Sequence, residues 1–176
     1  MEADILLWIQ EYLRFPALDS LMKAITHLGD IGIFWIVMAI LLILYPERRR
    51  AGFSVMIGML LSLLINNLFI KNVVRRVRPY EVINGLESLI GKMGEFSFPS
   101  GHTATSFVAA TIIACMLPQK RYGIAAIILA AMIGFSRIYI GVHYPTDVLF
   151  GAASGALIGM LVVWFSSLKD KKLFQE

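Results

Sequence analysis

The chain has 176 residues, of which 58% are hydrophobic and 16% are charged, and its formal net charge is +4. Soluble domains contain about 45–50% apolar and about 25% charged residues, so the apolar content exceeds what one globular core needs. A single cysteine excludes a disulfide scaffold, and the length permits one domain. The composition therefore predicts an all-α protein, an integral membrane helical bundle that uses lipid as its solvent.

Residues 1–30 are predicted to form two amphipathic helices that lie in the membrane interface. Apolar residues recur at helical spacing on both sides of Pro16, which breaks the helix. Five charges between residues 4 and 23 disfavour a buried crossing. A sixth crossing built from this region is the alternative. His27 is interpreted as structural.

Five apolar runs predict membrane crossings, which give a transmembrane core over residues 31–168 and a basic cytoplasmic tail over residues 169–176. The runs are Ile31–Pro46, Ala51–Ile70, Phe96–Gln119, Tyr122–Ser136 and Val148–Leu168. Their lengths lie near the roughly 20 residues that a helix needs to span a bilayer. In the last run, the spacing of Gly151, Gly155 and Gly159 favours close helix packing within the chain over dimerisation.

Positive charge gathers in the short segments on one side of these crossings. Eight residues contribute: Arg48, Arg49, Arg50, Lys120, Arg121, Lys169, Lys171 and Lys172. The positive-inside rule places this side in the cytoplasm, so residues 71–97 and 137–147 face outward. Because the membrane accounts for these charges, we expect no nucleic-acid partner.

Three polar clusters fall on the outward side, and the first begins at Lys71. On a helix that continues the second crossing, Lys71, Arg75 and Arg78 would share one face and hold an anion between them. Pro79 marks the end of that helix. The alternative is that these long cations only snorkel to the lipid headgroups.

The second cluster opens the third crossing. Pro99 suits a first helical position, and Gly101 lets an anion approach the free N–H groups at the start of the helix. His102 at the membrane boundary is costly unless it is used or paired. The cluster predicts a phosphate site.

The third cluster surrounds the turn into the fifth crossing. Arg137 and His143 precede Pro145, which suits the first turn of a helix. Asp147 lies four residues after His143, so it can accept a hydrogen bond from one ring nitrogen and leave the other as a nucleophile. Stabilisation of the helix start by Asp147 is the alternative.

Together these clusters suit phosphoryl transfer without a metal ion. Cations spread the charge of the phosphoryl oxygens, one histidine attacks, and the other protonates the leaving oxygen. No Asp, Glu and His residues have metal-ligand spacing on this side, so we expect no metal and no cofactor.

The three clusters resemble the motifs of the type-2 phosphatidic acid phosphatase superfamily, in order and spacing. The motifs are Lys-x6-Arg-Pro at Lys71–Pro79, Pro-Ser-Gly-His at Pro99–His102, and Ser-Arg-x5-His-x3-Asp at Ser136–Asp147. The resemblance covers residues from about 50 to the C-terminus. It implies a metal-independent phosphatase of lipid phosphates, multi-pass in the bacterial cell membrane, with its active site facing the periplasm.

The resemblance also implies a role for each matched residue. His143 would form a phosphohistidine, Asp147 would orient it, and His102 would protonate the leaving group and then help to activate water. The phosphoryl oxygens would be held by the side chains and backbone of Lys71, Arg78, Ser100, Gly101 and Arg137.

The substrate is expected to be a lipid phosphate, because the chain offers no soluble domain to select a soluble one. Small bacterial members of the family resemble undecaprenyl-diphosphate phosphatases, which makes that lipid the first prediction. Phosphatidylglycerophosphate and phosphatidate are the alternatives. Arg75 and Arg76 are predicted to contact a second phosphate or lipid headgroups.

A non-enzymatic lipid-phosphate-binding or transport protein is the competing class. Binding alone does not need the pair His143 and Asp147, which favours the enzyme. Membrane lipids are the remaining expected partners, and the sequence leaves the oligomeric state open.

Overall fold

The computed structural model of the chain describes residues 1–173, and every regular element within them is a helix. The all-α bundle is thereby confirmed. In chain order the elements are α1 (Glu2–Tyr12), α2 (Pro16–Leu28), the 3-10 turn η1 (Asp30–Gly32), α3 (Ile33–Leu44), α4 (Arg49–Ser62), the π-helix η2 (Leu63–Ile70), α5 (Lys71–Val74), α6 (Pro79–Val82), α7 (Gly101–Met116), α8 (Lys120–Tyr139) and α9 (Pro145–Leu173). Of the predicted tail, residues 174–176 lie outside the described residues.

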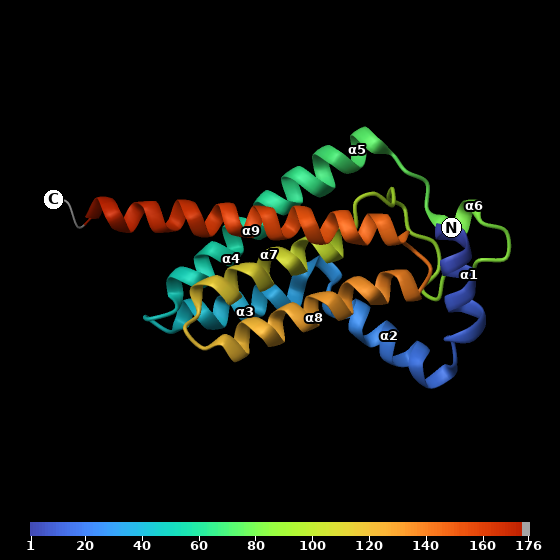
Figure 1. The fold of residues 1–176 in the computed structure, drawn as a ribbon, viewed down its shortest axis with the longest axis horizontal. Coiled ribbons are helices and arrows are strands. Elements are labelled where there is room, and N and C mark those ends of the chain that lie inside the picture. The colour runs from blue at the N-terminus through green and yellow to red at the C-terminus, as the bar shows by residue number, and fades with distance from the viewer. Residues whose placement is uncertain (174–176) are drawn as a thin grey trace.

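The long helices run side by side along one axis (Figure 1). The α3–α4 and α7–α8 turns and the C-terminal end of α9 lie at one end of the bundle, and the N-terminus, α1 and α6 lie at the other. Helix α7 packs against α9, α8 and α4. It carries the centre of the apolar core, which includes the fully buried Val108 and Ile112.

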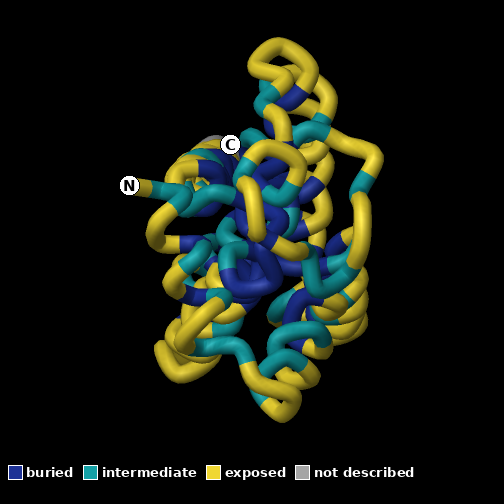
Figure 2. Tube along the Cα trace, turned by 90° about the vertical axis from the view of Figure 1, so that its right-hand side faces the viewer, coloured by how far each residue is buried: buried dark blue, intermediate teal, exposed yellow. Residues whose placement is uncertain are grey.

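The outside of the bundle is apolar as well. Viewed along the bundle, buried segments gather at its centre and exposed segments form its surface (Figure 2). Large apolar side chains are exposed on the outer helices, including Leu44, Leu60, Ile124, Leu149 and Phe165. Exposure of such a surface to water is unfavourable by about 25 cal/mol per Å², whereas lipid accommodates it.

Three helical segments are long and apolar enough to cross a membrane: the one that begins at Arg49, Lys120–Tyr139 and Pro145–Leu168. A fourth crossing results if α2 and the η1–α3 segment, which are bent by 47°, form one broken span. The chain is therefore a multi-pass membrane protein. In that arrangement α2 shares a crossing with α3, which differs from the predicted interfacial position.

Two predicted crossings form shorter helices than expected. The run Ile31–Pro46 contributes the 12 residues of α3, because the chain bends at η1. The run Phe96–Gln119 contributes the 16 residues of α7, because Ser100 caps the helix by accepting a hydrogen bond from the Thr103 N–H. Pro99 consequently precedes the cap and does not occupy the first helical position, whereas Pro145 begins α9 as predicted.

The predicted helical face of Lys71, Arg75 and Arg78 is wrong. Helix α5 ends at Val74, Arg75 adopts a left-handed conformation with φ of 51°, and Arg78 is extended. Pro79 explains the extended backbone of Arg78 because its ring disfavours helix at the preceding residue. Lys71 and Arg78 thus reach the same region from a helix and from a loop.

The glycine ridge of α9 packs within the chain, which confirms the prediction. A Cβ atom on Gly151 would lie 2.8 Å from the carbonyl oxygen of Ser100, and one on Gly159 would lie 2.9 Å from Cβ of Thr111. The absence of side chains lets α9 approach α7 closely. This contact brings the start of α7 beside the start of α9, where the polar residues gather.

Candidate active site

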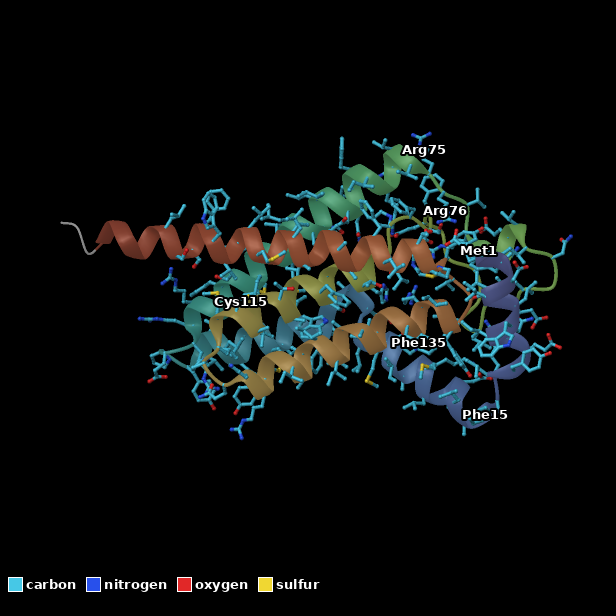
Figure 3. All side chains as sticks on the ribbon, viewed as in Figure 1. Met1, Phe15, Arg75, Arg76, Cys115 and Phe135 are labelled. Atoms are coloured by element: carbon cyan, nitrogen blue, oxygen red, sulfur yellow. The ribbon has the colours of Figure 1, made fainter. Side chains whose placement is uncertain are left out.

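A cavity of about 730 Å³ lies where η1, α5, α7 and the turn between α8 and α9 meet. The predicted site residues that line it are Lys71, Arg78, Gly101, His102, Arg137 and His143. Its position is the end of the bundle that carries the N-terminus. Figure 3 marks this end by Met1, Arg75 and Arg76, with Cys115 near the opposite end.

His143 is buried in the turn between α8 and α9, with one partner on each ring nitrogen. Nδ1 lies 3.4 Å from Oδ2 of Asp147, and Nε2 lies 3.4 Å from Nη1 of Arg78. Because a guanidinium group only donates hydrogen bonds, this arrangement assigns the lone pair to Nε2 and the proton to Nδ1. A neutral imidazole of this tautomer can act as a nucleophile through Nε2.

The surroundings of His143 keep it neutral. Burial, together with the nearby cations Arg137 and Arg78, lowers the pKa of His143 well below its ordinary value. Asp147 is itself held in place, since its Oδ2 accepts the backbone N–H of Tyr144 at 2.9 Å. The imidazole is therefore both oriented and unprotonated.

Two buried guanidinium groups face the cavity without a carboxylate partner. Arg78 donates to the carbonyl oxygens of Glu95 and Val142 at 2.7 and 2.9 Å. Arg137 donates to Oγ1 of Thr26 at 2.7 Å, and its buried Nε has no hydrogen-bond partner in the described part of the chain. Neither forms an ion pair with any of the described residues. Since a buried cation without a counter-charge is costly, the pair suits an anion.

Lys71 supplies a third cation and is paired with a residue that sequence reasoning missed. Its Nζ lies 2.7 Å from Oε2 of Glu95, a largely exposed side chain on the loop before α7. Lys71 lowers the pKa of the Glu95 carboxyl, which stays ionised. Nothing in the sequence distinguishes Glu95 from Glu87, the other acidic residue of that loop.

His102 stands in the first turn of α7 and contacts a second missed residue. Its Nε2 lies 2.8 Å from Oδ1 of Asp30, and Oδ2 of Asp30 lies 2.7 Å from Nδ1 of His27. Asp30 belongs to η1, far from the motifs along the chain. A lone acidic residue between apolar segments is its only signal.

The two small residues of the second motif have different surroundings. Gly101 lines the cavity, and a Cβ atom there would lie 2.6 Å from Oδ1 of Asn67, so the Asn67 side chain would have to shift to admit a larger residue. Ser100 is fully buried, and its Oγ accepts from Oγ1 of Thr103 at 2.9 Å. Its side chain does not line the cavity. Asn67 belongs to the π-helix η2, a geometry that often marks functional sites.

Arg75 and Arg76 are not brought to the cavity. Arg75 is exposed and donates to the carbonyl oxygen of Asn72 at 2.8 Å. Arg76 lies behind the site, with Nη1 at 2.7 Å from Oδ1 of Asp147 and Nη2 at 2.7 Å from Oε2 of Glu2. Arg76 is therefore placed to hold Asp147, and its contact with a second phosphate or a lipid headgroup stays a prediction.

The sequence profile of the PAP2 superfamily matches residues 51–171, a range that contains all three motifs and every residue predicted for the site. The chain belongs to the PAP2 superfamily. Asp30 and His27, which reach the site from the N-terminal segment, lie before the matched range. Within the described part of this PAP2 protein, no three His, Cys, Asp or Glu side chains are grouped to hold a metal ion.

Several curated proteins are similar to this PAP2 protein over most of their length. An undecaprenyl-diphosphatase of Sulfolobus acidocaldarius is 29% identical, and the match covers 94% of this chain and 79% of the relative. An undecaprenyl-diphosphatase of Bacillus subtilis is 32% identical over 86% of this chain and 76% of the relative. Phosphatidylglycerophosphatase B of Bacillus subtilis is 30% identical over 93% of this chain and 82% of the relative.

Solved structures share the fold. The PAP2-type phosphatidylglycerolphosphate phosphatase of Bacillus subtilis superposes with a TM-score of 0.78 at 30% identity, over 94% of this chain and 84% of that one. Aquifex aeolicus LpxE gives a TM-score of 0.79 at 26% identity, over 91% and 93%.

Proposed function

We propose that this membrane lipid phosphatase removes the terminal phosphate of undecaprenyl diphosphate through a phosphohistidine on His143. The observation that carries the proposal is the pair of buried guanidinium groups, Arg78 and Arg137, beside the Nε2 lone pair of a neutral imidazole. An anion that carries an electrophilic phosphorus is the ligand that satisfies both features.

In the first step, Nε2 of His143 attacks the terminal phosphorus. The N–P bond forms, the bond from phosphorus to the leaving oxygen breaks, and His102 gives its proton to that oxygen. Asp147 accepts a hydrogen bond from the Nδ1–H group, which stays protonated, and stabilises the positive charge that develops on the ring. Lys71, Arg78 and Arg137 bind the phosphoryl oxygens, as does the backbone at Gly101.

In the second step, water attacks the phosphohistidine. His102, now neutral, takes a proton from the water, the O–P bond forms, and the N–P electron pair returns to His143. Inorganic phosphate leaves, and both histidines regain their initial protonation. Every step uses side chains of this chain, so the reaction needs no metal ion.

The lining of the cavity supports a lipid as the substrate. Beyond the polar residues, the same cavity is lined by apolar side chains of α3, α4 and η2: Ile36, Met56, Met59, Leu60 and Leu63. A phosphate between the cations would leave its hydrocarbon chain against this wall. The site is open to the lipid-facing side of the bundle, where Leu60 is exposed.

The choice of a polyprenyl diphosphate rests on the similar proteins. Two of the relatives above act, by name, on undecaprenyl diphosphate, and a 32% identical protein of Mycobacterium tuberculosis is a decaprenylphosphoryl-5-phosphoribose phosphatase. Phosphatidylglycerophosphate is the second candidate because of the structural likeness to a phosphatase of that lipid.

The site is proposed to face the periplasm from the bacterial cell membrane. Five of the eight clustered cations, Arg48–Arg50, Lys120 and Arg121, lie at the turns between α3 and α4 and between α7 and α8. These turns are at the end of the bundle opposite the cavity (Figure 1). The positive-inside rule places them in the cytoplasm.

A hydrolysis panel tests the proposal. Purified protein in EDTA is given undecaprenyl diphosphate, phosphatidylglycerophosphate and phosphatidate in one detergent, and phosphate release is measured. We expect release from all three with the highest kcat/KM for undecaprenyl diphosphate, and loss of at least about a thousandfold in His143→Asn. A higher kcat/KM for phosphatidylglycerophosphate overturns the substrate assignment. No release from any of them favours a binding protein.

A further inference from the structure

The carboxylate of Asp30 lies between two histidines at the edge of the cavity. Oδ1 accepts from Nε2 of His102 at 2.8 Å, and Oδ2 accepts from Nδ1 of His27 at 2.7 Å. Asp30 also lines the cavity itself. The contact between Asp30 and His102 is an aspartate–histidine pair, like that of Asp147 and His143, but its aspartate comes from a separate part of the chain.

The backbone around Asp30 is arranged for this contact. Ile31 has φ of 55° and Gly32 has φ of 69°, so two successive residues are left-handed. This conformation is strained for a β-branched residue, and Ile31 is 92% exposed, so no packing of its side chain offsets the strain. Strain of this kind accumulates where function requires a particular geometry.

Gly29 shows how closely the turn approaches the histidine. A Cβ atom on Gly29 would lie 2.6 Å from Cδ2 of His102. Any larger residue would push the ring or the turn away. The strained turn and the glycine together hold Asp30 and His102 at hydrogen-bond distance.

From these contacts we infer that Asp30 is a positioning residue for His102, and that His27 braces it. The inference rests on the proposed function, in which His102 transfers the proton. Asp30 binds the Nε2 proton, so Nδ1 is the ring nitrogen that exchanges a proton with the substrate. Among residues 1–168, whose side chains the structure describes, none forms a hydrogen bond with Nδ1 of His102.

The proton balance gives Asp30 a role in both steps. Nδ1 gives its proton to the leaving oxygen in the first step and takes one from water in the second. Nε2 keeps its proton throughout, and Asp30 stays ionised. The carboxylate therefore stabilises the imidazolium, as an aspartate does for the general base of a Ser-His-Asp triad.

A counter-charge is needed because the other charged groups near His102 are mostly positive. They are Lys71 from α5, Arg78 from the loop before α6, Arg137 from α8, and Glu95, which is already paired with Lys71. His143 is neutral. Burial and these cations both disfavour the protonated form of His102 that the first step requires, and the Asp30 carboxylate opposes them.

The test compares two leaving groups in Asp30→Asn, which keeps the shape of the side chain. With dioctanoyl phosphatidate, a poor alkoxide leaving group, we expect kcat to fall about 10–100-fold with little change in KM, since general acid–base catalysis contributes roughly 10²–10⁴-fold in total. With p-nitrophenyl phosphate the first step needs no acid. Phosphoenzyme captured in an alkaline quench should therefore accumulate, because only the second step is slowed.

Matched variants separate positioning from folding. Asp4→Asn changes an exposed carboxylate of α1 and should match the wild type, whereas His27→Gln should show a smaller loss in the same direction as Asp30→Asn. Thermal unfolding in detergent monitors the fold. The role of Asp30 is overturned if Asp30→Asn loses kcat equally on both substrates and accumulates no phosphoenzyme. It is also overturned if Asp30→Asn keeps the wild-type kcat on both. Absence of phosphoenzyme from wild type and variant alike overturns the phosphohistidine instead.

Discussion

The four arginines near the site differ in what their guanidinium groups contact. Arg78 and Arg137 are buried and have no carboxylate partner among the described residues, Arg76 is shared between Asp147 and Glu2, and Arg75 is exposed. In the sequence, Arg75, Arg76 and Arg78 look equally suited to phosphate. Burial and pairing distinguish them, and neither can be obtained from spacing alone.

At the scale of single residues, Arg76→Ala should lower kcat about 10–100-fold on monophosphate and diphosphate lipids alike. The reason is that Asp147 would lose a charged hydrogen bond at Oδ1, a loss of roughly 1–3 kcal/mol, and would orient His143 less well. Rates on phosphatidate and undecaprenyl diphosphate measure the effect. The matched control is Arg75→Ala, expected at the wild-type rate. A loss confined to the diphosphate would instead indicate a contact with the second phosphate.

The helices show which features of an element a sequence reveals. Apolar runs predict that α4, α8 and α9 exist, because lipid-facing and buried positions both need apolar residues. Helix ends depend on single residues, and η2 is π-helical for reasons that no residue pattern indicates. The predicted helix face of Lys71 and Arg78 is wrong because α5 ends at Val74, before Arg78. The two residues still line one cavity, since the loop before α6 returns Arg78 to it.

At the scale of helix pairs, Gly155→Leu should destabilise the protein by about 1–3 kcal/mol or more. A Cβ atom at Gly155 would overlap the backbone oxygen of Ala104 on α7, and backbone cannot move aside as a side chain can. Because α7 carries His102 and α9 carries Asp147, activity should fall as well. Thermal unfolding in detergent measures the effect. Ala153→Leu, at an exposed position two residues away on α9, serves as the control and should leave the midpoint unchanged.

At the scale of the whole molecule, the N-terminal segment contacts the region that the PAP2 profile matches and contributes residues to the site. Glu2 accepts from the backbone N–H of Thr146 at 3.0 Å, and Arg14 donates to the carbonyl oxygen of Tyr139 at 2.9 Å. Thr26 contacts Arg137 and Asp30 contacts His102. The motifs identified the residues after position 50 that line the cavity with charge, apart from Glu95, because their types and spacing recur together. The residues before it act through contacts between distant parts of the chain, which spacing does not encode.

The pH dependence of the whole protein follows from the burial of His143. Its ordinary pKa is 6.5, and burial beside two arginines lowers it in the folded protein. As pH falls below about 6.5, His143 binds a proton in the unfolded chain but not in the folded protein. The folding free energy therefore becomes less favourable. This contribution is fully present above pH 6.5 and is lost progressively below it.

The prediction is measured as the thermal midpoint of wild type and His143→Asn in detergent at pH 7.5 and pH 5.5. We expect the wild type to lose more stability between these values than the variant, because asparagine does not titrate. The same shift places the acid limb of kcat/KM below pH 6.5, since the nucleophile stays neutral down to a lower pH. Equal losses of stability, or an acid limb at or above 6.5, would show that the folded protein does not keep His143 neutral.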